Sequence, residues 1–383
     1  MPKSSVKNSL TRRSLGRFAG VLAAGSAIPV FTEPMLAQIA SKALPAQSGV
    51  ISMPADAVKI NANEYPAGPC AEAAEAVHTV IRNTGRYLYE HTFELTVAMA
   101  RSEDLVPDYV QPFAGSSDAL HRFVLACTGP SRSLVVADPG YEAGARAAQL
   151  SGARVVPVKL AADYAHDVKA MAAADRRAGL IYVCNPNNPT GTLTPRADIE
   201  WLLNNKPEGS VLLVDEAYIH FSPADSCADL VARDKDIVVL RTFSKLYGMA
   251  GLRAGVAMAR PDLLARIKPW AAGSLPATSM VGATVSLQVK NLVATRRKSM
   301  RDIRDDTFSF LTKHNIGFIP SESNCFMLDA KRPGAEFVAA MAKENIYVGR
   351  VWSALPNHSR ITVGSAEDMA RFHQALLKVM AQV

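Results

Sequence analysis

The sequence predicts an α/β protein with a mostly parallel sheet between helices, together with a smaller α+β domain. Two observations lead to this fold class. Six short apolar runs alternate with Ala-rich segments that suit helices, and near residue 296 this alternation gives way to a mixture of strands and helices. Continuously apolar strands separated by helices are typical of a parallel sheet that is buried on both faces. A chain of 383 residues is also long enough for two domains.

The six apolar runs are the predicted strands of the sheet, and each of them ends in turn-forming or polar residues. In chain order they read SLVVADPG, ARVVPVKL, GLIYVCNPNNPTG, SVLLVDEAY, DIVVLRTFSK and RAGVAMAR. Ligands of such sheets bind outside the carboxyl ends of the strands. We therefore expect a binding site among the residues that end four of these runs, at 138–141, 185–190, 215–218 and 242–245.

The carboxyl-terminal part of the chain predicts a smaller set of helices and strands. Helices are expected at 296–315, 334–345 and 366–380, and strands within IGFIPSESNCFMLDA, IYVGRVW and SRITVGS. We accordingly divide the chain into a leader (1–45), an N-terminal arm that contributes to the small domain (46–75), a large domain (76–292) and a small domain (293–383).

The first residues resemble an export signal. TRRSLGRFAGVLAAGSAIPVF places Arg12 and Arg13 before a modest apolar stretch rich in Ala and Gly, which is the order of a twin-arginine signal. The stretch is too short and too weakly apolar for a membrane span. We expect cleavage between about residues 37 and 48 and a periplasmic protein without a membrane anchor. The alternative is a cytoplasmic protein with an irregular leader.

The formal charge of +7 does not indicate nucleic-acid binding. Residues 1–17 hold five Lys and Arg and no acid, so the rest of the chain carries only +2. Later basic residues alternate with acids, as on a solvated helix face. The five Cys are scattered, without the spacing of a metal site or a disulfide framework, and the His residues show no such spacing either. We expect neither nucleic acid nor metal to bind.

The side chains that follow the strands form a specific set of chemical groups. Lys245 offers a primary amine that can form a Schiff base with an aldehyde, and Asp215 offers a carboxylate that can keep a pyridine nitrogen protonated. Tyr218 and Asn188 can hydrogen-bond a phenolic oxygen, and Tyr141 can stack on a flat ring. Taken singly, each residue suits a structural role equally well, such as capping a helix or packing at the edge of the core.

A phosphate site is predicted close to these groups. The segment GSSDAL places Ser116 and Ser117 at a helix N-terminus, where free N–H groups and the helix dipole favour an anion. Arg253 adds a bidentate cation, and Thr242 and Ser244 add hydroxyl groups. Groups for an aldehyde, a pyridine ring, a phenolic oxygen and a phosphate together predict pyridoxal 5′-phosphate (PLP) as the cofactor.

Nine motifs in one order resemble the class I/II aminotransferases of PLP fold type I, in their histidinol-phosphate aminotransferase-like branch. They are INANEYPAGP, GRYLYE, GSSDAL, PGY, NPNNPTG, VDEAY, RTFSKLYGMAGLRAG, PSESNCF and SRITVG, and they extend from residue 58 or so to the carboxyl end. The resemblance implies a seven-stranded sheet in the large domain, PLP as the cofactor, and transfer of an amino group between an L-amino acid and a 2-oxo acid.

The same resemblance implies a role for each site residue. Lys245 is the Schiff-base lysine and Asp215 is the partner of the ring nitrogen, so both are expected to be catalytic. The other residues implied at the cofactor are Tyr87, Ser116, Ser117, Asp118, Tyr141, Asn188, Tyr218, Thr242, Ser244 and Arg253. Those implied at the substrate are Asn63, Asn324 and Arg360, with Arg360 on the α-carboxylate. Tyr87 matches a tyrosine that reaches the cofactor phosphate of the partner subunit, which implies a homodimer with a shared active site.

Two departures from the family pattern concern the substrate. The segment NEYPAG has Ala67 where an aromatic residue commonly precedes the glycine. The segment IYVGRV has Gly349 where histidinol-phosphate enzymes carry an arginine for the substrate phosphate, and Arg350 follows one position later. A shift by one residue along a strand turns a side chain to the opposite face. We therefore expect Arg350 to lie away from that phosphate position.

Two other functions stay open. A PLP-dependent lyase or decarboxylase would use Lys245 and Asp215 in the same way, because both residues help to stabilise a carbanion at Cα. The bond that breaks depends on which Cα substituent stands perpendicular to the ring. A non-catalytic, cofactor-binding regulator is disfavoured, because Lys245 is intact and the sequence contains no evident helix-turn-helix segment.

Overall fold

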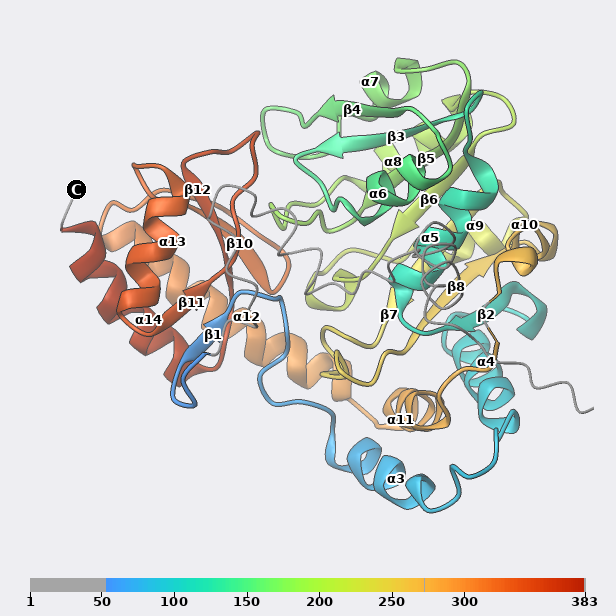
Figure 1. Ribbon diagram of the computed structural model, residues 1–383, viewed down its shortest axis with the longest axis horizontal. Coiled ribbons are helices and arrows are strands. Elements are labelled where there is room, and N and C mark those ends of the chain that lie inside the picture. Colours follow the sequence, from blue (N-terminus) through green and yellow to red (C-terminus); the bar gives the residue numbers. More distant parts are fainter. Residues whose placement is uncertain (1–52, 272, 382–383) are drawn as a thin grey trace, which may run out of the picture. The chain divides into compact units, whose positions relative to one another are not determined.

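Seven strands form one mixed sheet in the structure, a computed structural model that describes residues 53–271 and 273–381 (Figure 1). Their order across the sheet is β2-β8-β7-β6-β5-β3-β4. The strands β3 to β7 run parallel to one another, whereas β8 is antiparallel to both of its neighbours. The strands are β2 (Val110–Phe113), β3 (Ser133–Asp138), β4 (Val155–Lys159), β5 (Ala178–Cys184), β6 (Val211–Asp215), β7 (Ile237–Thr242) and β8 (Gly255–Ala259). The predicted mostly parallel sheet is confirmed.

One strand of this sheet, β2, has no counterpart among the predicted apolar runs. It lies at the edge of the sheet and pairs only with β8. Its sequence VQPF contains a proline, which lacks the N–H group that a central strand needs and is tolerated at an edge. A short edge strand of this kind leaves little periodicity to detect in the sequence.

Helices cover both faces of the sheet. Alternate residues of a strand point to opposite faces, so an apolar strand needs a covering layer on each side. In β5, Leu180 and Tyr182 belong to one core cluster, and Ile181 and Val183 belong to the other. The strands β5 to β8 are buried along their whole length, which explains why they read as uninterrupted apolar runs. The first cluster includes residues of three helices, α5 (Ser116–Cys127), α6 (Ala143–Leu150) and α10 (Pro261–Arg266). The second cluster includes residues of five helices, α4 (Glu90–Ser102), α7 (Val168–Ala173), α8 (Arg196–Asn205), α9 (Ala228–Ala232) and α11 (Ala277–Gln288).

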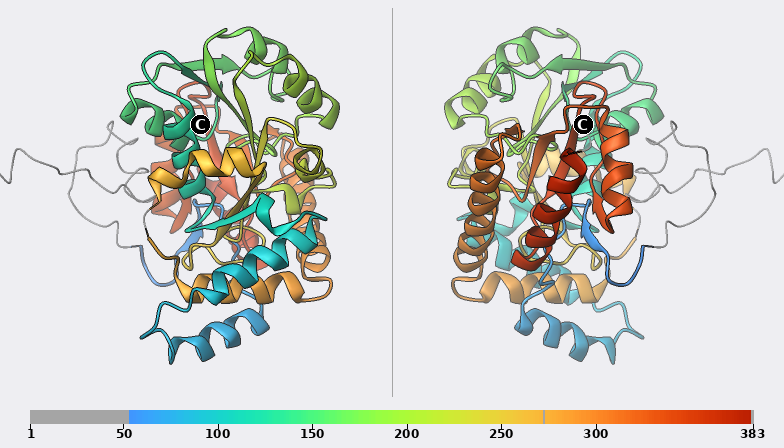
Figure 2. Two further views of the ribbon diagram at one scale, coloured as in Figure 1. Left: turned by 90° about the vertical axis from the view of Figure 1, so that its right-hand side faces the viewer. Right: turned by 90° about the vertical axis from the view of Figure 1, so that its left-hand side faces the viewer.

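The carboxyl-terminal part contributes two smaller sheets. β10 (Cys325–Asp329) lies between β9 (Phe318–Ile319) and β12 (His358–Thr362) and is antiparallel to both, while β1 (Val58–Ile60) pairs in parallel with β11 (Ile346–Val348). Three helices lie beside these sheets in the views of Figure 2, namely α12 (Leu292–Lys313), α13 (Gly334–Lys343) and α14 (Ala366–Met380). They correspond to the three helices predicted for this part of the chain.

The pairing of β1 with β11 joins the start of the described chain to its carboxyl-terminal part. After β1, the chain passes through residues 61–70 to α3 (Ala71–Ile81) and then to the large sheet. Residues Pro54–Val383 form one unit by their internal contacts. The boundaries predicted at 75/76 and 292/293 therefore stay predictions, and the predicted leader lies outside the described residues.

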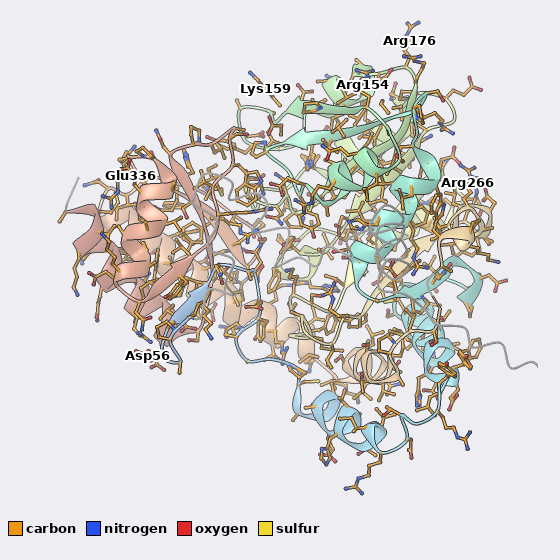
Figure 3. All side chains as sticks on the ribbon, in the orientation of Figure 1. Asp56, Arg154, Lys159, Arg176, Arg266 and Glu336 are labelled. Atoms are coloured by element: carbon orange, nitrogen blue, oxygen red, sulfur yellow. The ribbon has the colours of Figure 1, made fainter. Side chains whose placement is uncertain are left out.

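Charged side chains on the surface extend outward from the described part of the chain. Figure 3 labels six of them, Asp56, Arg154, Lys159, Arg176, Arg266 and Glu336. Within 53–271 and 273–381, no helix is both long and apolar enough to cross a bilayer. In the same residues, no group of three or more His, Cys, Asp or Glu side chains is arranged to hold a metal ion.

Candidate active site

Asp215 is the last residue of β6, and its carboxylate is buried where the parallel strands end. The hydroxyl of Tyr182, on the neighbouring strand β5, donates to Oδ2 at 3.0 Å, and the backbone N–H of Ala217 donates to Oδ1 at 3.1 Å. Burial raises the pKa of Asp215 from 3.8 to about 6, although both hydrogen bonds and the charge of Lys245 oppose this rise. A cationic group bound beside Asp215 would therefore be stabilised.

Lys245 lies three residues after the end of β7, the strand next to β6. Its Nζ donates to the carbonyl oxygen of Ala62 at 3.4 Å and lies 5.7 Å from the centroid of the Tyr218 ring. The positive charge of Lys245 also lowers the pKa of Asp215. The amine and the buried carboxylate thus share one site, which is what adjacent carboxyl ends of parallel strands are expected to produce.

A chain of hydrogen bonds surrounds the hydroxyl of Tyr218. Nδ2 of Asn63 donates to this hydroxyl oxygen at 3.0 Å, and Asn63 is itself held by the Thr362 hydroxyl at 2.9 and 3.0 Å. Oδ1 of Asn188 accepts from Nη1 of Arg360 at 2.9 Å, which leaves the Asn188 amide group to act as a donor. Burial raises the pKa of Tyr218 well above 10, so its hydroxyl keeps its proton and can donate.

Two buried polar atoms on this side of the site have no protein partner, Nε of Arg360 and Oδ1 of Asn324. Nη2 of Arg360 donates to the carbonyl oxygen of Asn61 at 2.7 Å. Nδ2 of Asn324 donates to the carbonyl oxygens of Asn63 and Glu64 at 3.1 and 3.3 Å. A buried polar atom without a hydrogen-bond partner destabilises the folded protein. Both atoms are therefore suited to hydrogen-bond a ligand. The Arg360 atom is a donor and matches a carboxylate, whereas the Asn324 atom is an acceptor and matches an N–H or O–H group.

Arg253 lies against the start of α5 and forms an anion cradle with two hydroxyl groups. Gly115, which precedes α5, has a φ of 88°, and a Cβ there would lie 2.5 Å from Nη2 of Arg253. Only glycine allows the guanidinium to lie so close to this loop. Nη1 of Arg253 donates to the Ser244 hydroxyl at 3.3 Å, and the Thr242 hydroxyl also donates to Ser244, at 3.0 Å.

The first turn of α5 provides the other side of this cradle. Ser116 is buried, and Oγ of Ser117 lies 3.3 Å from the hydroxyl of Tyr141, which follows β3. The free N–H groups at the start of a helix favour an anion. The structure thus brings the residue that is expected to stack on the ring next to the expected phosphate site.

These groups together fit PLP. The cradle suits its phosphate, the buried carboxylate of Asp215 suits a protonated ring nitrogen, and Tyr218 and Asn188 offer donors for its phenolic oxygen. The amine of Lys245 suits its aldehyde. A family model described as aminotransferase class I and II matches residues 55–376 of the chain.

The chain belongs to the class I and II aminotransferases.

Comparison with relatives agrees with this membership. The aminotransferase is 35% identical over 342 residues to a histidinol-phosphate aminotransferase of Symbiobacterium thermophilum, an alignment that covers 85% of this chain and 91% of the relative. Its fold is similar to that of histidinol-phosphate aminotransferase from Sinorhizobium meliloti in complex with pyridoxal-5′-phosphate, with a TM-score of 0.78 and 24% identity over 84% of this chain and 90% of that one. It is also similar to L-threonine-O-3-phosphate decarboxylase from Porphyromonas gingivalis, with a TM-score of 0.74 and 21% identity over 84% of this chain and 99% of that one. Fold type I, PLP and transamination are confirmed.

Two of the expected cofactor residues have other partners in this chain. Asp118 forms two hydrogen bonds of 2.8 Å with the guanidinium of Arg122, so its carboxylate is engaged within α5. Tyr87 lies in the segment between α3 and α4, where its side chain is 69% exposed and its ring stacks on Tyr89 with centroids 5.4 Å apart. Tyr87 is therefore available to a second molecule.

The expectation that Arg350 lies away from the position of a substrate phosphate stays a prediction for the aminotransferase. The guanidinium carbon of Arg350 lies 4.6 Å from the centroid of the Trp352 ring, and that of Arg360 lies 5.5 Å from the same centroid. The chain is not a regular strand at this point, because two residues, Gly349 and Arg350, face the single residue Arg360.

Two kinds of site residue were not predicted. Tyr182 is an aromatic residue within an aliphatic strand, two positions before the strand end, which is a signal of a special role; its hydrogen bond to Asp215 follows only from the pairing of β5 with β6. Glu142 and Trp352, which contact Arg350, gave no comparable signal. They lie far from one another in the sequence, and only the folded chain brings them together.

Proposed function

We propose that the aminotransferase moves an amino group between an L-amino acid and a 2-oxo acid, with Lys245 as the group that holds the cofactor and carries the proton. The observation that supports this most directly is the placement of the Lys245 amine and the buried carboxylate of Asp215 at the ends of the neighbouring strands β7 and β6. When bound, PLP supplies a ring that withdraws electrons from the substrate Cα. The Lys245 amine would hold the cofactor, and when free it would act as the base whose Nζ accepts the proton from Cα.

The remaining cofactor residues position and charge the ring. Asp215 would keep the ring nitrogen protonated, since a buried carboxylate is stabilised by a neighbouring positive charge. Tyr218 and Asn188 would donate to the phenolic oxygen. The cradle of Arg253, Ser244, Thr242 and the first turn of α5 would bind the phosphate through charge-assisted hydrogen bonds.

Arg360 and Asn324 define the substrate side of the site. The buried, unpaired Nε of Arg360 supports an α-carboxylate as its partner, and fixing this carboxylate selects the Cα bond that stands perpendicular to the ring. The relative from Symbiobacterium thermophilum is named for histidinol phosphate, which carries a phosphate ester where an amino acid carries its carboxylate. We propose an α-amino acid as the donor of this aminotransferase.

A substrate screen on the PLP-loaded protein tests this function. With an amino acid alone, a transaminase forms one equivalent of 2-oxo acid and stops until a 2-oxo acid acceptor is added. Continuous release of carbon dioxide or another fragment without an acceptor would instead establish a decarboxylase or lyase, the chemistry for which the Porphyromonas gingivalis neighbour is named.

Two variants test the residue roles. Lys245→Ala should still bind amino acids but abolish turnover, and borohydride treatment of the parent should attach the cofactor to the peptide that contains Lys245. Arg360→Ala should raise KM for amino acids while changing simple amines much less. Cofactor attached to another lysine contradicts the role of Lys245, and unchanged KM values contradict the role of Arg360.

We also propose a homodimer in which Tyr87 completes the cofactor phosphate site of the partner subunit. Its exposed ring supports this proposal, as do the exposed side chains of Tyr89 and Phe93 nearby in the chain, at 65% and 66%. The rings of Tyr87 and Tyr89 stack on each other, and adjoining exposed apolar groups can mark a site of protein association. We also propose that Arg12 and Arg13 belong to a twin-arginine signal, which would export the folded, PLP-loaded protein to the periplasm.

A further inference from the structure

Gly349 and Arg350 form an irregularity opposite Arg360. The backbone N–H of Gly349 donates to the carbonyl oxygen of Arg360 at 2.7 Å, and the N–H of Arg360 donates to the carbonyl oxygen of Arg350 at 3.3 Å. Two residues on one side thus face one residue on the other, as in a β-bulge, which can re-aim a side chain beside an active site. A Cβ at position 349 would lie 2.5 Å from the Arg360 carbonyl oxygen, so glycine permits this close approach.

The bulge keeps two guanidinium groups at one aromatic ring. The guanidinium carbons of Arg350 and Arg360 lie 4.6 and 5.5 Å from the centroid of the Trp352 ring. Nε1 of Trp352 donates to the carbonyl oxygen of Gly140 at 3.2 Å, which anchors the indole beside Tyr141. Arg350 is therefore held close to the substrate-binding Arg360 and to the residue expected to stack on the cofactor.

The charges of the two arginines are balanced differently. Nη2 of Arg350 donates to the carboxylate of Glu142, the residue directly after Tyr141, so a negative charge compensates its positive charge. The acceptors of Arg360, in contrast, are the uncharged oxygens of Asn188 and Asn61. The side chains of Arg350 and Glu142 are 24% and 35% exposed. Water therefore reaches the pair, and a side-chain substitution at 142 can be accommodated.

We propose that Glu142 determines which anionic group the site accepts next to the substrate Cα. This inference rests on the proposed function, because it names the substrate class of the same site. A carboxylate carries one charge, and a single arginine can bind it with two parallel hydrogen bonds. A phosphate ester carries a charge of about −1.5 to −2 at pH 7. By pairing with Arg350, Glu142 leaves Arg360 as the guanidinium without a compensating carboxylate, and its own negative charge would oppose the additional charge of a phosphate. The site thus selects α-amino acids over phosphate esters of amino alcohols.

Two amino donors with the same imidazole side chain test this selection. Histidine carries a carboxylate next to Cα, and histidinol phosphate carries a phosphate ester on the neighbouring carbon. Their reactions with the PLP-loaded protein are followed by the absorbance of the bound cofactor, in single-turnover experiments without an acceptor. In Glu142→Gln, the efficiency for histidinol phosphate relative to histidine should rise roughly tenfold or more, the size expected for one charge-assisted hydrogen bond to the released Arg350. Glu142→Ala should act in the same direction.

Two controls separate this effect from a general loss of charge. Adding Arg350→Gln to Glu142→Gln should cancel the gain, because the released guanidinium is then absent. Glu200→Gln removes a carboxylate of the same kind from a helix surface, where it pairs with Arg196 at 2.9 Å, and should leave the ratio unchanged. A gain that survives Arg350→Gln, or an unchanged ratio in both Glu142 variants, would overturn the inference.

A binding measurement distinguishes failure of this inference from failure of the proposed function. Inorganic phosphate is titrated calorimetrically into the PLP-loaded parent and into Glu142→Gln, with the melting temperature as a check on folding. Tighter phosphate binding by the variant supports the role of Glu142 even if no amino donor reacts with any variant, a result that would refute the proposed function. Equal phosphate affinity in the two folded proteins argues against the role of Glu142, whatever the turnover.

Discussion

The buried carboxylate of a single residue, Asp215, suits a protonated cofactor ring but lowers the stability of the cofactor-free folded protein. The residue is 3% exposed, and burial raises the pKa of its carboxyl group to about 6 from an ordinary value of 3.8. Between these two pH values, the folded protein retains a proton that the unfolded chain has released. The folded state therefore loses stability as the pH rises through this window, and the loss persists at higher pH. A bound, protonated pyridine ring would compensate the buried charge.

The cofactor-free Asp215→Asn variant should consequently be more stable than the cofactor-free parent at pH 8. An amide does not ionise; its oxygen can accept from the Ala217 N–H while its NH2 group donates to the Tyr182 hydroxyl, so up to about 3 kcal/mol of unfolding free energy should be recovered. Urea unfolding between pH 3.5 and 8 measures the difference, which should vanish at the acidic end. The same variant should lose most of its PLP-dependent turnover. Equal stability of variant and parent at pH 8 would show that the buried carboxylate does not lower the free energy of unfolding.

At the scale of the element, the arm that follows β1 is fastened to the loop that carries Lys245. The guanidinium carbon of Arg296, in α12, lies 4.5 Å from the centroid of the Tyr65 ring, and its Nη1 donates to the carbonyl oxygen of Leu246 at 2.9 Å. Gly248 lies against the same arm with a φ of 71°, and a Cβ there would lie 1.9 Å from the carbonyl oxygen of Gly68. The arm also holds Asn63 in the active site, so its position affects substrate binding.

Gly248→Ala should therefore displace the arm. We expect a loss of roughly 2 to 4 kcal/mol of stability, since the added methyl group meets backbone and the φ is unfavourable for alanine. KM for amino acids should rise as well. Gly251→Ala is the matched control, because nothing lies within 4 Å of its added Cβ, and its effect should stay within about 0.5 kcal/mol. Similar melting temperatures for the two variants would contradict the close packing of this arm.

At the scale of the whole molecule, the proposed dimer predicts complementation between inactive subunits. Mixing Lys245→Ala with Tyr87→Phe should restore part of the activity if Tyr87→Phe alone is impaired, because one of the two shared sites then contains both native residues. Mixing Lys245→Ala with Arg253→Ala should restore none, since these residues belong to the same side of one site. Activity assays after joint refolding measure both mixtures, and full activity in a monomer would refute the shared site.

The proposed export also concerns the whole molecule. Replacing Arg12 and Arg13 together by lysine should retain the protein in the cytoplasm, because the twin-arginine pathway reads the arginine pair. Fractionation of cells, followed by detection of the protein and of its bound PLP, measures the outcome. Unchanged recovery of this variant from the periplasm would contradict the proposed signal.

The fold class and the residues at the strand ends could be predicted from the sequence. Continuous apolar runs predict strands buried on both faces, and parallel strands bring the residues after their carboxyl ends to one edge. This is why Lys245, Asp215, Tyr218 and Asn188 were predicted as one site. The resemblance to a known family added the substrate residues and Tyr87.

Which side chains meet across the site depends on the folded chain and could not be predicted. The edge strand β2 has too little periodicity to be seen in the sequence, and the hydrogen bond from Tyr182 to Asp215 depends on the pairing of β5 with β6. Arg350 and Glu142 are 208 residues apart, and a bulge opposite Arg360 brings them together. A local sequence pattern carries no information about such a contact, because strand order and backbone irregularities determine where a side chain finally points.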